Sequence, residues 1–406
     1  MYRPQKIARL QFPLRNNTIA AVSSVERDVV RLDERTRYSQ LASAVRKTLL
    51  RADALGTTCI FHIYPDIYTV MRLEAAGYLL EETQDTNKAL RSLVWEESHP
   101  TMEAALLVYR QMQATEWVID PKNRSTIETP QDMLNLYGRS IGGPTLESAP
   151  LSFRETHKET GTEEIAYEPP RPEDIDELLL DYCEFINATA LSPLTQASLA
   201  QFQFEAIKPF NEDLDRIERL IMHYILNRRR LVEKIVLPVN LFSAHFKDRF
   251  NDLLKPYSGA SDTMHDDTIL YAEDLMFYTV SVSQELAKLT ISLHKMLSSL
   301  VSTWKQRLQR VDKGSAIELL LYELAGTPIM TISQGRDLIN KSFSATNDAF
   351  ERLESTGIVK IGSSIRRNRT FEAPEAILLH DSMYEKRATT YQEFVDEEPL
   401  PVAQNE

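Results

Sequence analysis

Apolar residues recur at helical spacing along most of this chain. The N-terminal third shows the pattern over Ile19–Ala54, up to an interruption at Gly56, and again over Leu73–Leu80 and Met102–Val118. A repeat of three to four residues places apolar side chains on one face of a helix. Residues 1–125 are therefore expected to form an N-terminal helical region.

The pattern changes between residues 126 and 262, which we expect to form a second domain. Short β-prone pieces at Leu151–Arg154 and Ile165–Tyr167 flank Gly161 in a polar stretch. This arrangement predicts a small β-hairpin flap over 151–168. Helical spacing then resumes, with acidic residues in a first turn where they complement the helix dipole.

A long helical pattern without Gly or Pro runs from Leu270 to Val311. It predicts one or two long connecting helices over 263–312. A homodimer contact through these helices is an open alternative.

Residues 313–375 show the pattern of a separate small domain. Three short helices are expected at Ala316–Leu324, Ser333–Leu338 and Ser344–Ser355, followed by two β-prone pieces. Helix, turn, helix and a two-stranded wing describe a winged helix-turn-helix. The remaining residues, 376–406, have few apolar positions and an acidic run, so we expect a disordered acidic tail.

Composition narrows the class of protein. The 406 residues carry a net charge of -13, which argues against general binding to nucleic acid or anionic membranes. The two cysteines, Cys59 and Cys183, are far apart and indicate neither a disulfide scaffold nor a zinc site. We find no apolar stretch of a signal peptide or a membrane span, so a cytoplasmic setting is expected.

The stretch Phe204–Leu226 concentrates charges at the start of a predicted helix. Glu212 and Arg216 are four residues apart, as are Asp215 and Arg219. Such pairs stabilise a helix by roughly 0.2–0.5 kcal/mol each, so they explain both arginines without a ligand.

The same stretch resembles the signature of the Fic/Doc (Fido) family, HPFx(D/E)GNGRxxR. Here the segment from Lys208 to Arg219 reads KPFNEDLDRIER, preceded by SLAQFQFEAIKPF, which is similar to the family's AxxHxQFExIHPF run. Other pieces, such as YEPPRPEDIDELLLDYCEFIN and the winged helix, follow in the family's order. The resemblance implies a mostly α fold: a Fic-like helical core with a β-hairpin flap, plus the C-terminal winged helix-turn-helix.

In the family, the motif transfers AMP from ATP to a hydroxyl on a target protein. By resemblance, Lys208 occupies the position of the histidine base, and Glu212 the position of the magnesium ligand. Arg216 and Arg219 stand where arginines hold the triphosphate.

The sequence departs from the signature where the chemistry is performed. An ammonium with an ordinary pKa near 10.4 has no lone pair to accept a proton, so Lys208 is a poor base. The phosphate-binding Gly-Asn-Gly is Asp213-Leu214-Asp215. A carboxylate about 4 Å from a phosphate charge costs on the order of 4 kcal/mol at an effective dielectric of about 20. We therefore expect no cofactor; ATP and Mg²⁺ would bind only if the family activity survives.

A second departure concerns the inhibitory helix that many family members carry, (S/T)xxxE(G/N). Thr57-Thr58-Cys59-Ile60 resembles its start, but Phe61 and His62 replace the Glu-Gly. Loss of the inhibitor fits an inactive enzyme. An ordinary amphipathic helix end at this place is the alternative.

The predicted wing carries the clearest remaining signal for binding. Lys360, Arg366, Arg367 and Arg369 lie on or beside its turn, where arginines commonly contact DNA phosphates. However, residues 313–375 contain eight basic and eight acidic residues, which weakens the electrostatic attraction to DNA. A winged helix that binds protein is the alternative.

Three hypotheses follow from the sequence. The chain is a catalytically degenerate Fic-like protein that acts as a regulator or adaptor, with DNA bound by the winged helix. Alternatively, it is a nucleotidyltransferase with altered chemistry, in which Lys208 contacts phosphate. The third hypothesis is a docking scaffold whose flap, 151–168, pairs with a strand of a target protein.

Overall fold

A computed structural model describes residues 6–8, 14–59, 65–83, 100–125, 127–141, 152–155, 170–210, 214–238, 266–362 and 369–382. Within these ranges the protein is mostly helical, with one small antiparallel sheet, as expected for the fold class. The acidic tail beyond residue 382 and all of the predicted flap except residues 152–155 lie outside the described residues, whereas residues 376–382, predicted as part of the disordered tail, are helical.

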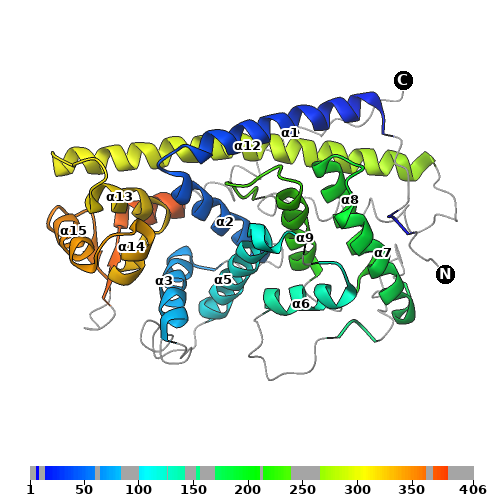
Figure 1. Ribbon diagram of the computed structural model, residues 1–406, viewed down its shortest axis with the longest axis horizontal. Coiled ribbons are helices and arrows are strands. Elements are labelled where there is room, and N and C mark those ends of the chain that lie inside the picture. The colour runs from blue at the N-terminus through cyan, green and yellow to red at the C-terminus, as the bar shows by residue number, and fades with distance from the viewer. Residues whose placement is uncertain are drawn as a thin grey trace.

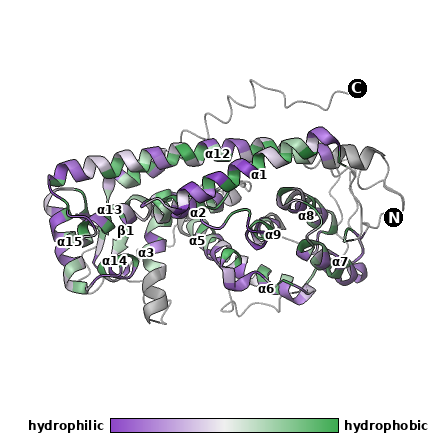
Figure 2. Cartoon of the chain, turned by 45° about the horizontal axis from the view of Figure 1, so that its top comes forward, coloured by the Kyte–Doolittle hydropathy of each residue, from purple (hydrophilic) through white to green (hydrophobic). Residues whose placement is uncertain are grey.

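One long helix, α12 (Asp266–Leu308), spans the molecule, and α1 (Asn16–Arg37) lies along it (Figure 1). The long helical pattern predicted for this region is thus a single helix. Leu286, Leu293 and Leu297 are fully buried and lie seven and four residues apart, which keeps them on one face. Hydrophobic and hydrophilic residues alternate along α12 (Figure 2), so its apolar face packs inward while the rest is polar.

Three helices occupy the middle of the molecule: α2 (Ala42–Cys59), α3 (Ile67–Thr83) and α5 (Pro100–Ile119). The interruption predicted at Gly56 is wrong, because this glycine lies buried inside α2. The chain instead turns at residues 38–41, between α1 and α2. Apolar spacing continued through that short turn, so periodicity alone did not reveal it.

A cluster of helices forms the end of the molecule opposite the sheet (Figure 1). Its members are α6 (Pro130–Ile141), α7 (Ile175–Asn187), α8 (Pro193–Ile207) and α9 (Leu214–Arg228), with 3-10 turns at Pro121–Asn123 and Pro172–Asp174. α8 is buried along nearly its whole length and contacts α7, α9 and α12. Its first turn is capped by Ser192, whose hydroxyl accepts from the backbone N–H of Thr195.

The C-terminal unit combines three helices with a three-stranded sheet. Its elements are α13 (Ala316–Gly326), β1 (Ile329–Thr331), α14 (Ile332–Ile339), α15 (Phe343–Ser355), β2 (Lys360–Ile361) and β3 (Thr370–Glu372). The strands are antiparallel in the order β1-β3-β2, with Met330 opposite Phe371. β1 was not predicted: it is three residues long and follows Pro328, which the pattern presents only as a break. Residues 374–382 are helical.

A buried polar cluster fastens the C-terminal unit to α2 and α3. Arg51 pairs with Glu74 at 2.5 Å and donates to the carbonyl of Gly326 at 3.0 Å. It also donates to Nδ1 of His380, whose Nε2 donates to the carbonyl of Ala325. Burial and the nearby Arg51 charge lower the pKa of His380 to about 3, so this imidazole is neutral.

Candidate functional site

The motif begins where α8 ends, at Lys208. Lys208 adopts the left-handed conformation with φ 45° and ψ 60°, and its N–H donates to the carbonyl of Phe204. A left-handed residue at this place ends a helix by satisfying one of its last carbonyls. Pro209 follows and has no N–H with which to continue the helix. The backbone therefore turns sharply at the position of the family's base.

The turn is held by Arg154, which is almost fully buried. Its side chain donates to the carbonyls of Lys208, at 2.7 Å, and of Pro170, while its backbone N–H donates to the carbonyl of Pro209. Carbonyls that end a helix need such donors when they are buried. The sequence presented Arg154 only as the end of a β-prone piece, so its role was missed; an arginine in an apolar strand piece was the available signal.

Phe210 anchors the turn in the core. Its ring stacks on Tyr137 with centroids 4.2 Å apart, and Phe153 and Phe204 lie against it at 5.5 and 6.4 Å. These contacts join α6, the segment 152–155 and α8 at one point. The Pro-Phe pair of the motif therefore serves packing, whatever the chemistry beside it.

Lys208 forms an ion pair at the site. Its Nζ lies 3.1 Å from Oε1 of Glu205, one turn earlier on α8, and the Lys208 side chain is 22% exposed. A lysine ammonium donates hydrogen bonds and accepts none, so Lys208 serves here as the cation of the pair. The sequence named Glu212, Asp213 and Asp215 as the acidic neighbours; the structure adds Glu205 from the preceding helix.

Helix α9 is buried on all sides. The expected core residues Ile217, Ile221, Tyr224 and Ile225 are fully buried, but so are Arg216, Glu218 and Arg219. The sequence predicted an intrahelical pair for each arginine, Glu212 with Arg216 and Asp215 with Arg219. Glu212 lies outside the described residues, as does the side chain of Asp215, so the pairs themselves stay predictions.

Arg219 stands out among these buried charges. It is 3% exposed, and its Nε and Nη1 have no hydrogen-bond partner among the described residues. A buried guanidinium with unused donors is costly unless an anion approaches it. The donors thus fit a phosphate or carboxylate ligand at this place.

A carboxylate, that of Glu218, lies next to Arg219 on α9. Glu218 accepts a hydrogen bond from Gln201 at 2.8 Å, and Gln201 occupies the place of a family histidine. Burial, with the charge of Glu218 beside it, raises the pKa of Tyr182 well above its ordinary value. Tyr182 therefore stays protonated and donates to the carbonyl of Ala200. The Tyr182 hydroxyl therefore does not supply a base at this place.

His223 lies one turn beyond Arg219 on α9 and makes a separate contact. Its Nε2 donates to Oδ2 of Asp53 on α2 at 2.8 Å, and both side chains are buried. His223 does not lie at the motif turn. Cys183 is also a core residue, since burial raises its pKa to about 12 and keeps the thiol protonated.

The position of the family's inhibitory helix is only partly described. Thr57 and Thr58 are buried at the end of α2 and donate to carbonyls of their own helix. Phe61 and His62 lie outside the described residues, as do Asn211, Glu212 and Asp213.

The predicted DNA-binding cations have acidic partners. Lys360 pairs with Glu372 at 3.4 Å, and Arg369 pairs with Glu354 at 3.3 Å while stacking on Phe371. Arg366 and Arg367 lie outside the described residues.

The exposed face of α15 is acidic. It presents Asp348 and Glu351, while Arg352 donates to carbonyls at the end of α12. Acidic groups on this face oppose a nucleic acid backbone.

Metal ligands and membrane helices were also sought. No group of three or more His, Cys, Asp or Glu residues that could hold a metal occurs in the described part of the chain. The helices of that part include none with the length and apolar character needed to cross a membrane.

Comparison with known proteins supports the resemblance. Residues 129–226 match the Fic/DOC family, so the chain contains a Fic/DOC-family domain. No curated protein matches the chain.

Two solved structures were also matched, both at low identity. A Fic family protein from Desulfovibrio desulfuricans is 15% identical with a TM-score of 0.47, over 92% of this chain and 98% of that one. A Fic domain containing signaling protein from Bacteroides thetaiotaomicron is 12% identical with a TM-score of 0.37, over 60% of this chain and 98% of that one.

Proposed function

We propose that this chain is a Fic-domain protein that no longer transfers AMP and acts by binding, as a regulator or adaptor. The observation that carries the proposal is the Lys208–Glu205 ion pair at the position of the family's base. A charged ammonium cannot remove a proton from a target hydroxyl. The protein works in the cytoplasm, in line with its two separated cysteines.

Restoration of the motif tests the loss of transfer. The variant combines Lys208→His with Gly-Asn-Gly at 213–215 and is compared with the unaltered chain in labelled ATP and Mg²⁺. We expect no self-modification by the unaltered chain. Magnesium-dependent labelling of the unaltered chain that disappears in its Arg219→Ala variant would overturn the proposal.

Nucleotidyl transfer with altered chemistry is a second candidate, favoured by the unused donors of Arg219. Lys208 and Arg219 would then hold phosphate, and Glu212 would stand at the magnesium position. Calorimetry with ATP, CTP, GTP and UTP in Mg²⁺ tests it, with exposed Arg230→Ala as the matched control. Binding lost only in Arg219→Ala supports this candidate; no heat up to millimolar nucleotide rejects it.

DNA binding by the C-terminal unit belongs to the regulator proposal. The order of helices and strands from α13 to β3 is that of a winged helix-turn-helix, which supports it. The acidic partners of Lys360 and Arg369 favour protein as the ligand instead. DNA binding would be supported if it depends on salt and is lost when Arg366, Arg367 and Arg369 are replaced. If no gel shift appears at low salt, DNA is rejected as the ligand, and an adaptor that binds protein remains.

Docking by the flap is tested separately. A pull-down with the full chain is compared with one lacking residues 156–168. A partner captured only when the flap is present supports docking at 151–168, and an unchanged set of partners rejects it.

A further inference from the structure

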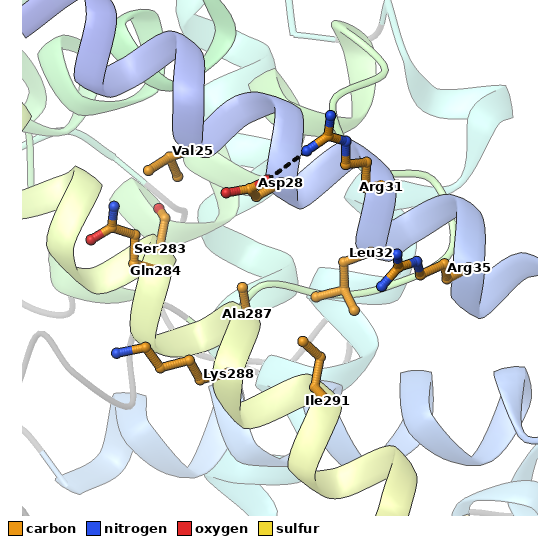
Figure 3. Close-up of a pocket in the computed structure, with 10 residues that line it drawn as sticks. All are labelled: Val25, Asp28, Arg31, Leu32, Arg35, Ser283, Gln284, Ala287, Lys288 and Ile291. Carbon is orange, nitrogen blue, oxygen red and sulfur yellow. Dashed lines mark hydrogen bonds and ion pairs between the residues drawn. The ribbon is translucent and has the colours of Figure 1, made fainter.

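A groove of about 540 Å³ lies between α1 and α12 (Figure 3), far from the motif in sequence. Its floor is apolar: Val25 and Leu32 come from α1, and Ala287 and Ile291 from α12. Ile291 is 43% exposed, although it lies opposite Leu32 across the groove. The two helices therefore pack without closing over this floor.

The rim of the groove is basic. Arg35, Arg31 and Lys288 line it, together with one carboxylate, that of Asp28. Arg31 bonds to Asp28 and Lys288 to Glu285, whereas the Arg35 side chain forms no ion pair within the described part of the chain. In a chain of net charge -13, this is a local site for an acidic ligand.

The described chain ends close to this groove. His380 donates to the carbonyl of Ala325 on α13, and Tyr322, one turn earlier on α13, bonds to Gln40. Gln40 follows Arg35 by five residues and lies in the turn just after α1. The end of the described chain is therefore tied to α13, which contacts the turn at the Arg35 end of the groove.

The sequence beyond this point contains a segment with matching chemistry. Tyr391, Phe394 and Val395 have the spacing i, i+3, i+4 of one helix face, and Glu393, Asp396, Glu397 and Glu398 surround them. Residues 383–390 connect the segment to the fold and reach about 26 Å when extended.

We propose that the α1–α12 groove binds residues 391–398 of the same chain. The apolar side chains of the segment lie on the floor, and its carboxylates face Arg35 and Lys288. This is the common mode in which an amphipathic helix enters an apolar groove through a few anchors. The proposal is independent of the function proposed for the Fic domain.

Disulfide trapping in the full chain tests the proposal. The variant carries Ile291→Cys and Phe394→Cys, and the matched control carries Ile19→Cys and Phe394→Cys, because Ile19 is exposed on α1 away from the groove. Mass spectrometry after mild oxidation identifies the linked peptides. We expect an intrachain link at least about tenfold more abundant in the Ile291 variant.

Charge reversal identifies the cause of the link. Arg35→Glu in the Ile291 variant should lower its yield about fivefold, whereas Arg27→Glu, which does not line the groove, should leave it unchanged. A link between two chains, shown with mixed isotope labels, would assign the groove to a second copy and overturn the proposal. Equal yields in the Ile291 and Ile19 variants would overturn it too.

Discussion

Arg51 and Asp53 lie two residues apart on α2 and contact opposite neighbours. Arg51 donates to Gly326 of the C-terminal unit, and Asp53 accepts from His223 on α9. Both contacts are buried, so α2 joins the C-terminal unit directly to the helix that carries the motif arginines.

The Arg51–Glu74 pair should be essential to stability. Arg51→Met leaves the buried Glu74 carboxylate without its cation, which costs about 3–5 kcal/mol. The measurement is the urea midpoint of the full chain. The double variant Arg51→Met/Glu74→Gln is the control and should lose less than the single variant; an equal or greater loss would show that the pair itself is not the cause.

His380 should make stability depend on pH. Its pKa of about 3 lies below its ordinary value of 6.5, so the folded state binds fewer protons than the unfolded state between these values. Stability is therefore fully present above about pH 6.5 and falls by about 1.4 kcal/mol per pH unit toward pH 3. Denaturation from pH 7 to 4 checks this, and His380→Gln should remove that part of the slope.

Much of the fold could be predicted, because long apolar repeats fix helices locally. Helical structure over residues 270–308, predicted as one or two helices, and the helix at Ser344–Ser355 needed no tertiary information. β1 and the turn at residues 38–41 could not be found, since short elements depend on their neighbours for stability.

The site was predicted less completely than the fold. The motif gave the positions of Lys208, Arg216 and Arg219, but helical spacing could not reveal that α9 is buried on every side. Arg154 and Glu205 were missed because their contacts with the turn depend on how separate segments pack. Sequence distance carries no such information.

Gly326 should tolerate no side chain. A Cβ at this position would lie 2.3 Å from the Cα of Ala44 on α2, a backbone atom that cannot move independently. Gly326→Ala should therefore destabilise the protein by about 1–3 kcal/mol and loosen the C-terminal unit. Hydrogen exchange should rise in α2 and α13. The control, Gly314→Ala, has open space around it and should leave exchange in α2 unchanged.

Replacing Lys208 by glycine should cost less stability than replacing it by methionine. Its left-handed backbone, with φ 45°, costs an L-residue roughly 1–2 kcal/mol that glycine does not incur. The Glu205 carboxylate is only 12% exposed, so removing its cation costs more than it would at a surface ion pair. Lys208→Gly should therefore lower the thermal midpoint less than Lys208→Met, which loses the ion pair without relieving the backbone. Lys208→Val should lower it most, because a branched side chain fits this backbone worst. A large loss in Lys208→Gly and Lys208→Met alike would mean that the ion pair, and not the backbone, decides the stability of the turn.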